Sequence, residues 1–457
     1  MKLKQRVGDF RVRELLQRDY LVEQGEHRVY RVTKRKLTSD EAARILADEA
    51  GVAPSEVQLA GLKDRQGLTI QYMSVARGRE VRLQTAELRV EPAGFARNAL
   101  TSEHSLGNAF ELTVRALRRD DLPGLRANLP LMREYGTLNY FDDQRFGNLT
   151  HGQGWIFKEL CLGRHEQALR ALLGARSPRD DERHRHFKEG LERHWGDWRE
   201  CRDVAGRFGA HHSVFERLTK SPHDFAGAFE HIATRLKLIH LYAWQSHLWN
   251  RALVELVRGL LPPEECVPLP SEEGVLLAYR RAPPAALLAR ATFPLPGERL
   301  DDVRDPELRR LFEVVLEQEG LRAEQMSAAG VSGFALKGEE RELFLRPGHL
   351  RVRPPEPDTL NPNLWAVRVR FELPRGSYAT LVVKRLFERA PAAAVERQDA
   401  SRSAPSSEFR QREGWSRPVQ RDRGERDERG GERDRGRRGR GPHGTGPGRR
   451  PDPGRGR

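Results

Sequence analysis

The stretch LAGLKDRQGLTIQYMSV, residues 59–75, contains two strand-like runs separated by a polar hinge. Lys63, Asp64 and Arg65 form the hinge, with a glycine on each side. Glycine tolerates backbone conformations that other residues avoid, so it allows a tight turn or the close approach of a ligand. The pattern predicts a carboxylate between two cations at the point where a strand ends.

The charges at this hinge suggest a chemical role. In an extended chain the side chain of Asp64 points to one face, and those of Lys63 and Arg65 point to the other. Two flanking cations favour the ionised carboxylate, which suits a nucleophile or base acting on an anionic polymer. A surface turn with solvated charges has the same spacing, and the spacing alone favours that simpler interpretation.

The rest of the first 150 residues has a mixed α and β pattern. Further short strand candidates are residues 10–13, 29–32 and 110–115. In the last of these, Phe110, Leu112 and Val114 share one face.

A helix is predicted between the second and third strand candidates. Thr38 and Glu41 have the spacing of a capping box, in which the hydroxyl satisfies an amide of the first turn and the glutamate reaches back to the cap. The helix should run to about Ala50, and Gly51 supplies its end.

The middle of the chain has helical patterns, proline-rich breaks and many aromatic residues. Apolar residues keep helical spacing from about 228 to 258, and LPPEECVPLPSEEG (261–274) then breaks the pattern. Residues 184–200 contain three histidines without matching cysteine or carboxylate spacing. They predict one solvated, partly amphipathic helix rather than a metal site.

The strand pattern returns in the last part of the folded chain. Val367, Val369, Phe371 and Leu373 face one way, and a helical run from 378 to 389 follows. Strands at both ends and a helical middle predict one sheet domain that is interrupted by an insertion.

The charge of the chain points to a polyanionic partner. The net charge is +14, of which residues 401–457 carry +8 through seventeen arginines and nine acidic residues, leaving +6 for residues 1–400. Nucleic acid is the simplest such partner. The end of the chain is rich in Arg, Gly and Pro and cannot bury enough surface to fold. Its spacing resembles flexible RNA-binding tails, although such tails also serve only solubility.

Several classes of protein lack support. The three scattered cysteines indicate neither a disulfide framework nor a zinc knuckle and suit a reducing cytoplasm. No apolar run follows the first lysines, so no signal peptide is predicted, and no run of eighteen apolar residues predicts a membrane span. No Walker, HExxH or GxSxG motif is present in the sequence, and no GxGxxG follows a predicted strand.

Five motifs occur together in a fixed order. They are GLKDRQGLTIQ (61–71), LGNAFELTVR (106–115), NYFDDQRFG (139–147), LKGEERELFLRP (336–347) and LPRGSYAT (373–380). With GDFRVRE (8–14), the set resembles the TruD family of tRNA pseudouridine synthases over most of residues 1–150 and 330–388. In the middle, only YAWQSHLWNRAL (242–253) is similar to the family.

The resemblance implies an α+β fold, in which the mainly antiparallel sheet and flanking helices of pseudouridine synthases are interrupted by a family-specific α/β insertion. The expected boundaries are a catalytic domain in 1–150 and 346–390, an inserted domain in 151–345, and a disordered tail in 391–457. The two domains are expected to form an RNA-binding cleft.

The resemblance also implies the site. Asp64 corresponds to the catalytic nucleophile of the family. The expected substrate contacts are Phe10, Asn108, Phe110, Tyr378, Lys4 and Lys63. These types suit a flipped uracil, which needs an aromatic face to stack on and an amide to read its polar edge. From pattern alone, the aromatic residues would be assigned to the core.

The chain departs from the family pattern in two places. Gln66 and Gly67 follow the aspartate where His-Ala or a similar pair is common, and Asp142 stands where the family has glycine. Neither change removes a reacting group, and the added carboxylate would tune RNA affinity or substrate choice. NYFDDQRFG is predicted to build the cleft wall, with Arg145 on a phosphate.

The reaction expected from the resemblance is isomerisation of uridine to pseudouridine in tRNA, at position 13. Nothing is consumed, so we expect no cofactor and no metal, in a cytoplasmic monomer. Whether Asp64 attacks C6 or C1′ of the nucleotide, or assists loss of a sugar proton, stays open. The alternative is a non-catalytic RNA-binding or RNA-folding protein, which does not account for the joint presence of Asp64, Asn108 and the aromatic motif residues.

Overall fold

The computed structural model describes residues 1–147, 154–177, 180–328, 330–333 and 335–388. The predicted Arg- and Gly-rich tail and the last residue of the helical run from 378 lie outside these ranges. Within them, no helix combines the length and apolar character needed to cross a bilayer.

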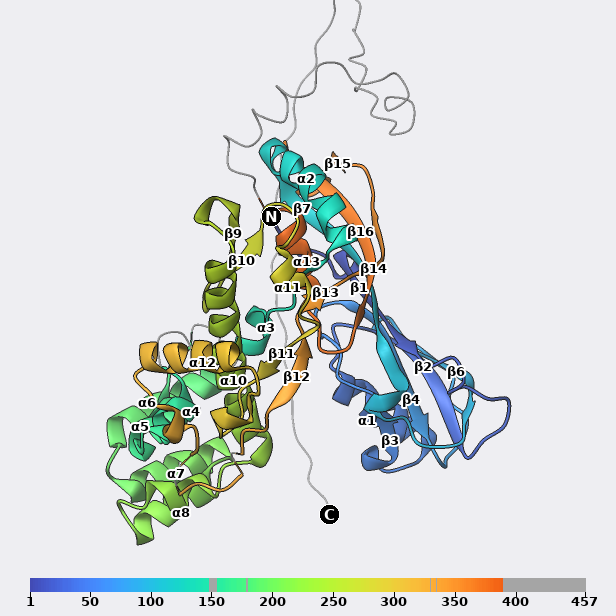
Figure 1. Ribbon diagram of the computed structural model, residues 1–457. Helices are drawn as coiled ribbons and strands as arrows, with labels where there is room; N and C mark the ends of the chain where they lie inside the picture. Colours follow the sequence, from blue (N-terminus) through green and yellow to red (C-terminus); the bar gives the residue numbers. More distant parts are fainter. Residues whose placement is uncertain (148–153, 178–179, 329, 334, 389–457) are drawn as a thin grey trace, which may run out of the picture. The chain divides into compact units, whose positions relative to one another are not determined.

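A ten-stranded sheet dominates one part of the described chain (Figure 1). Its main path runs β14-β16-β7-β1-β4-β2-β6-β5, with β15 added to β16 and β3 added to β4. The strands are β1 (Phe10–Leu16), β2 (His27–Arg35), β3 (Val57–Leu59), β4 (Leu68–Val75), β5 (Leu83–Gln84), β6 (Leu88–Ala96), β7 (Ser105–Leu117), β14 (Gly348–Val352), β15 (Glu356–Pro357) and β16 (Trp365–Pro374).

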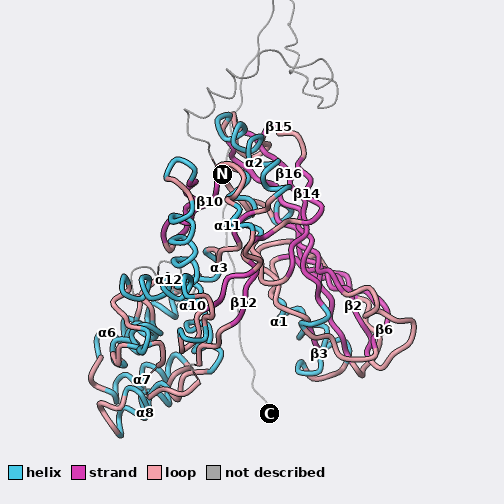
Figure 2. The backbone as a smooth tube through the Cα atoms, in the orientation of Figure 1, coloured by secondary structure: helices cyan, strands magenta, loops and turns pink. Residues whose placement is uncertain are grey.

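The sheet is mainly antiparallel, as predicted. Only the central pair β1 and β4 is parallel, with Val12 beside Thr69. β16 pairs with β7 so that Phe371 lies beside Phe110, which brings strands from both ends of the described chain together (Figures 1 and 2). The alternation read from the sequence holds here, because Leu112, Val114 and the matching residues of β16 are buried.

Helices cover one face of the sheet on either side of its centre. α1 (Ser39–Ala50) packs on apolar residues of β2 and β4. α2 (Leu122–Glu134) and α13 (Ala379–Leu386) pack on β7 and β16. The capping box of α1 is confirmed, since Thr38 Oγ1 accepts the amide of Glu41. The helix ends at Gly51, whose φ of 73° lies in the left-handed region where glycine is favoured.

The middle of the chain is mainly helical (Figure 2). Its helices are α3 (Asp143–Phe146), α4 (Ile156–Cys161), α5 (His165–Gly174), α6 (Glu182–His194), α7 (Trp198–Phe208), α8 (His212–Lys220), α9 (Phe225–Phe229), α10 (Thr234–Leu260), α11 (Ala285–Leu288) and α12 (Pro306–Gln318). The long helix α10 is the centre of this part, because both Trp244 and Trp249 on it are fully buried.

Short strand pairs and single turns join these helices. The pairs are β9 (Cys266–Ser271) with β10 (Gly274–Tyr279), β11 (Thr292–Leu295) with β12 (Glu339–Glu342), and β8 (Thr137–Leu138) with β13 (Phe344–Leu345). The 3-10 turns are Val7–Asp9, Pro54–Glu56, Ser102–His104, Arg119–Asp121, Pro263–Glu265, Leu300–Asp302 and Ala323–Gln325.

The structure corrects two local predictions. Residues 184–200 are not one helix, because α6 ends at His194 and Gly196 adopts a φ of 104° before Asp197 caps α7. The proline-rich segment after α10 ends the helix as expected, but it then forms the hairpin of β9 and β10. Its prolines are tolerated because this sheet has only two strands, so each strand has an unpaired edge.

Candidate active site

The loop between β3 and β4 holds Asp64 next to the central strand pair of the sheet. The loop returns to the sheet at Gly67, where an added Cβ would lie 2.7 Å from the carbonyl oxygen of Phe10. Real Cβ atoms do not approach a backbone oxygen so closely, so only glycine lets the loop pass this near to β1. The second glycine noted in the sequence therefore has a steric reason.

The carboxylate of Asp64 has two different partners. Its Oδ2 accepts a hydrogen bond from Lys4 Nζ at 2.7 Å, and its Oδ1 accepts a longer one from Gln144 Nε2 at 3.3 Å. About a quarter of the side chain is exposed (27%). The Lys4 ammonium also lies 4.2 Å from the ring centre of Phe10. The ion pair thus holds Oδ2, and the Phe10 ring supports the lysine of that pair, while Oδ1 has only the longer hydrogen bond from Gln144.

The cations on either side of Asp64 in the sequence do not contact its carboxylate. Lys63 Nζ donates to Glu14 Oε1 at 2.7 Å, and Arg65 Nε donates to the carbonyl oxygen of Lys36 at 3.2 Å. The alternation predicted for the hinge explains this, because Lys63 points away from Asp64 toward a buried carboxylate that needs a partner. The direct cationic neighbour of Asp64 is Lys4, from a distant part of the sequence.

A row of aromatic rings crosses the sheet beside Asp64. Phe10 and Phe110 meet edge to face with ring centres 6.3 Å apart, and Phe110 stacks on Phe371 at 5.5 Å. Phe10 and Phe371 are buried, whereas Phe110 is partly exposed. Pattern alone assigned these rings to the core, and the structure gives Phe110 both a core contact and an accessible face.

Tyr378 comes from the other end of the described chain. It lies immediately before α13, and its ring meets that of Phe141 edge to face at 6.3 Å. Burial raises the pKa of Tyr378, so its phenol stays neutral near pH 7. The side chain therefore offers an aromatic face and a neutral hydroxyl to the cleft.

Asn108 on β7 presents an unused polar atom. Its Oδ1 is buried and has no hydrogen-bond partner among the residues that the structure describes. Buried polar atoms are nearly always paired, so an orphaned acceptor needs an explanation. A ligand that carries an N–H group would supply the missing donor.

The short helix α3 forms the facing wall, against α10. Arg145 Nε donates to Ser246 Oγ at 3.0 Å, and the guanidinium lies 5.6 Å from the ring centre of Tyr242. Tyr242 is one of the exposed large hydrophobic side chains among the described residues. The motif NYFDDQRFG thus contributes Gln144 to the aspartate and Arg145 to the wall.

These side chains enclose one cleft of about 770 Å³, which suits a nucleotide-sized group. The structure brings every predicted site residue into its lining: Asp64, Lys4, Phe10, Lys63, Asn108, Phe110 and Tyr378. Residues of α10, including Arg235 and Tyr242, complete it.

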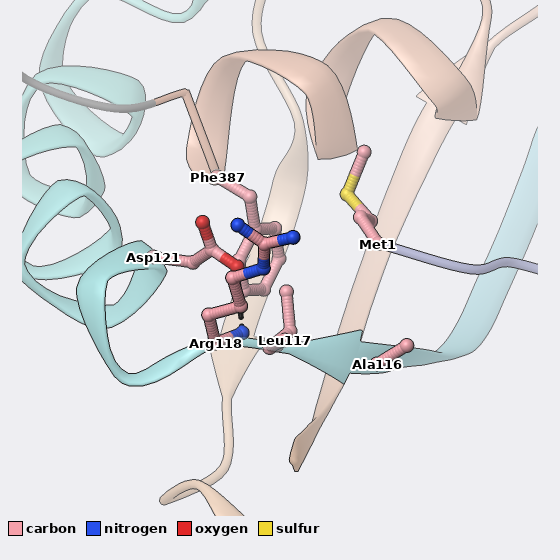
Figure 3. A pocket seen from close by; sticks show the side chains of 6 residues that line it. All are labelled: Met1, Ala116, Leu117, Arg118, Asp121 and Phe387. Atoms are coloured by element: carbon pink, nitrogen blue, oxygen red, sulfur yellow. Dashed lines mark hydrogen bonds between the residues drawn. The ribbon is translucent and has the colours of Figure 1, made fainter. Parts of the chain in front are cut away.

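A second hollow of about 380 Å³ lies elsewhere, near the N-terminus and the end of α13 (Figure 3). Ala116 and Leu117 of its lining are at the far end of β7 from Asn108, more than about 20 Å along an extended strand. The lining is Met1, Ala116, Leu117, Arg118, Asp121 and Phe387. This hollow is separate from the cleft that contains Asp64.

Sequence reasoning missed three polar residues around the cleft. Glu14, Lys34 and Gln144 contact the Asp64 loop or its carboxylate. A signal existed for the first two, because Glu14 continues the buried alternation of Phe10 and Val12, and Lys34 continues that of β2. A charged residue at an apolar position of a strand marks a buried polar network. For Gln144 the sequence carried no such signal.

Metal ligation finds no support in the described part of the chain. Within it, no group of three or more His, Cys, Asp or Glu side chains is arranged to hold an ion. In the histidine-rich segment, His184 Nδ1 is paired with Asp181 Oδ1 at 2.7 Å in a helix cap.

Known proteins resemble the chain over most of its length. The family model for tRNA pseudouridine synthase D (TruD) matches residues 1–386. The chain is 30% identical over 396 residues to a probable tRNA pseudouridine synthase D 2 of Methanocaldococcus jannaschii, covering 85% of this chain and 92% of that protein. It is 25% identical over 394 residues to the tRNA pseudouridine synthase D of Aquifex aeolicus, covering 85% and 98% respectively.

A solved structure has the same fold. The crystal structure of a putative tRNA pseudouridine synthase D from Methanosarcina mazei superposes with a TM-score of 0.64 and 22% sequence identity, over 85% of this chain and 93% of that one. The expected α+β architecture is thereby confirmed, and the family model gives the identity. The chain belongs to the TruD family of tRNA pseudouridine synthases, isomerases that convert uridine to pseudouridine in tRNA.

Proposed function

We propose that this enzyme isomerises uridine 13 of tRNA, with Asp64 as the nucleophile. The observation that carries the proposal is the cleft itself, in which an ionisable carboxylate, an unpartnered amide oxygen and an accessible aromatic ring lie together. The position within tRNA comes from the family resemblance. We further propose a monomer that acts in the cytoplasm.

The base-binding part of the proposal assigns a contact to each group. A uracil extruded from the RNA would stack against an aromatic ring of the cleft, Phe110 or Tyr378. Its N3–H would donate to Asn108 Oδ1, which otherwise stays unsatisfied. Arg145 and Arg235 at the α10 side would contact phosphates.

The chemistry starts from the Asp64 carboxylate. Lys4 holds Oδ2, so the proposed reacting atom is Oδ1. The N1–C1′ bond of the uridine breaks, the uracil turns within the cleft, and a C5–C1′ bond forms. The proton lost from C5 balances the proton gained at N1, so the reaction consumes nothing. Attack at C1′, addition at C6 and removal of a sugar proton all begin from the same carboxylate.

The proposed domain organisation follows the predicted boundaries. Residues 1–150 and 346–390 would form the catalytic domain, and residues 151–345 the insertion. The pairing of β16 with β7 and of β1 with β4 supports a sheet domain built from both ends of the chain. The contact between α3 and α10 supports a cleft wall that the insertion shares.

The test compares wild-type protein with Asp64→Asn on unmodified tRNA. Loss of a nucleophile lowers turnover by about 10⁴-fold or more, so Asp64→Asn should form no detectable pseudouridine while binding tRNA with nearly unchanged Kd. The exposed Asp40 of α1 offers the matched control, Asp40→Asn, which should react like the wild type.

Mapping of the product separates the parts of the proposal. Pseudouridine at another position would remove the assignment to uridine 13 and keep the chemistry. Equal activity of Asp64→Asn and wild type would remove Asp64 as the nucleophile. If the wild-type protein binds tRNA but forms no pseudouridine, the alternative of a non-catalytic RNA-binding protein would remain.

A further inference from the structure

A buried lysine lies against the backbone of the loop between β3 and β4, which carries Asp64. Lys34 is on β2, and none of its surface is exposed. Its ammonium donates to three carbonyl oxygens, those of Leu37 at 2.8 Å, Lys63 at 3.1 Å and Asp64 at 2.9 Å. All three N–H bonds of the ammonium are therefore used, and two of them hold the main chain at and before Asp64.

Stability alone does not explain a lysine at this position. Among the described residues, no ion pair includes Lys34, so the direct contacts of the buried charge are to carbonyl oxygens. Burying an ammonium is costly, and apolar residues of similar volume often serve the fold equally well. Burial lowers the pKa of Lys34 to about 8, although Asp64 and Glu41 attract the charge. Groups with strongly shifted pKa values concentrate at functional sites.

The contacts of Lys34 complete the support of an irregular loop. The segment from Ala60 to Gly67 belongs to no strand, so no ladder of hydrogen bonds fixes its path. Ser39 Oγ accepts the amide of Lys63 at 2.9 Å and donates to Gln71 Oε1 at 2.8 Å. Buried side chains thus hold both polar groups of the Lys63 backbone: Ser39 accepts its N–H, and the Lys34 ammonium donates to its carbonyl. The Lys34 ammonium also donates to the carbonyl of Asp64.

We propose that Lys34 is a positioning residue, whose ammonium gathers the carbonyls of Lys63 and Asp64 and thereby aims the Asp64 carboxylate into the cleft. The inference rests on the proposed catalytic role of Asp64. Lys34 is fully buried and does not line the cleft, so it makes no contact with RNA. Its loss should lower the rate of the chemical step and leave tRNA affinity nearly unchanged.

The charge of Lys34 also predicts a pH dependence. A neutral amine has only two N–H bonds for three carbonyls, so the loop loses a contact when Lys34 deprotonates. The charged groups facing Lys34 are Asp64 and Lys63 of the loop and Glu41 of α1. The single-turnover rate should fall as the pH rises through about 8, the folded-state pKa of Lys34.

Stability should follow the opposite trend over the same pH range. The pKa of Lys34 is lower in the folded protein than its usual 10.5, so between about 8 and 10.5 the unfolded chain binds the proton more tightly. This group therefore makes the folded state relatively more stable as the pH rises through that window. A falling rate together with a maintained melting temperature distinguishes a loosened loop from general unfolding.

The experiment compares Lys34→Met and Lys34→Arg with Arg35→Met, which removes an exposed cation from the same strand. Single-turnover rates at saturating tRNA, Kd for tRNA and melting temperatures are measured from pH 6 to about 9.5. A misplaced reacting group lowers the rate by about 100-fold. We expect that loss in Lys34→Met with Kd within about threefold of wild type, and no loss in Arg35→Met.

Lys34→Arg keeps the charge at every pH used. We expect it to retain part of the activity and to lose the decline above about pH 8. A decline caused by ionisation of the uracil itself would remain in this variant. Persistence of the wild-type decline in Lys34→Arg would overturn the pH inference.

Three outcomes would overturn the positioning role. The first is a rate of Lys34→Met equal to that of the wild type, and the second is an equal loss of rate and tRNA affinity in Lys34→Met. The third is a rate of the wild-type protein that does not change with pH up to about 9.5. If neither Lys34 variant folds, the wild-type rate and melting temperature across the same pH range decide. Asp64→Asn separates this inference from its premise, because activity in Asp64→Asn rejects the nucleophile whatever the Lys34 variants do.

Discussion

At the scale of single residues, the two oxygens of Asp64 have unequal roles. Lys4 grips Oδ2 at 2.7 Å, and Gln144 reaches Oδ1 only at 3.3 Å. A weak donor at the proposed reacting oxygen, Oδ1, can orient this oxygen and leave it nucleophilic, whereas a strong donor would lower its nucleophilicity. We infer that Gln144 orients Oδ1 and that its hydrogen bond to Oδ1 breaks when the substrate binds.

Gln144→Ala tests this role. Loss of one long hydrogen bond removes about 1 kcal/mol, so the single-turnover rate should fall by about fivefold to tenfold, with little change in Kd. Gln144→Glu should lower the rate more than Gln144→Ala, since its added carboxylate repels that of Asp64. The loss of rate should be larger at neutral pH, where the added carboxylate is ionised, than at acidic pH. A Glu variant as active as Ala at every pH would contradict the proposed contact.

Asn108 offers a second test at this scale. Asn108→Leu keeps the volume and removes the amide, so a bound uracil would lose the partner for its N3–H. Sites built to hydrogen-bond a substrate lose much of their discrimination when the group is removed, and we expect kcat/KM to fall by about 100-fold. Asn98→Leu, on the loop after β6, is the matched control. An unchanged kcat/KM for Asn108→Leu would show that the base is read elsewhere.

The sequence predicted which residues line the cleft better than what each one touches. Asp64, Asn108 and Tyr378 were found because their motifs resemble a family, and all line the cleft. The sequence attributed the ionised state of Asp64 to its chain neighbours Lys63 and Arg65, whereas the cation in contact with its carboxylate is Lys4. Side-chain partners across 60 residues depend on tertiary packing, which spacing in one chain does not contain.

At the scale of elements, the position of α3 decides where Gln144 lies. Lys384 of α13 donates to Asp142 and Asp143 at 2.6 Å each and ties the start of α3 to α13, whose first residues line the cleft. Asp143 also accepts from Ser271 Oγ and the amide of Glu272. The aspartate that departs from the family pattern is therefore a buried structural partner rather than an RNA-facing charge.

Lys384→Met tests this attachment. The change leaves two adjacent carboxylates without their cation, and breaking a buried pair destabilises a protein by about 3–5 kcal/mol. Denaturant unfolding at pH 7 should show that loss. The double variant Lys384→Met with Asp142→Asn should recover part of it, because it removes one of the unpaired charges. Equal stability of the two variants would contradict the assignment.

The same ion pair has a defined pH window. Burial acts to raise the pKa of Asp143, but hydrogen bonds from Lys384, the Glu272 amide and Ser271 outweigh it, so the pKa lies below the usual 3.8. A lowered carboxyl pKa contributes stability above pH 3.8 that is lost as the pH falls through the folded value. The stability gap between wild type and Lys384→Met should therefore narrow below about pH 4.

Elements were predictable where local signals were complete. The capping box and terminal glycine fixed both ends of α1. The single helix expected over residues 184–200 failed because the amphipathic spacing continues past Gly196, and a glycine inside a helical pattern is ambiguous without the left-handed φ that the fold imposes. The hairpin of β9 and β10 was missed because prolines obscure a strand pattern.

At the scale of the whole molecule, the positive charge of the chain should favour its encounter with tRNA. Residues 401–457 carry +8 of the net +14, and they lie outside the described ranges. Each phosphate neutralised by a cation releases counterions, so affinity falls with salt in proportion to the number of contacts. A tail with this charge should raise affinity most strongly at low salt.

Deletion of residues 401–457 should weaken tRNA binding at low salt and flatten the slope of log Kd against log salt. The single-turnover rate at saturating tRNA should stay unchanged, because the cleft is built from residues before 381. Filter binding across a salt series and quench-flow at high tRNA concentration measure the two effects. An unchanged salt slope would leave the tail a role in solubility or localisation only.

The pairing of β16 with β7 has a consequence for synthesis on the ribosome. β7 ends at Leu117, but its partner begins at Trp365, so nearly 250 residues emerge before that edge is covered. Throughout this interval β7 presents a long row of unpaired amides and carbonyls, which is a template for aggregation. This edge of β7 therefore stays open to other strands during the interval, and Tyr378 can join the cleft only after residues 118–377 have been synthesised.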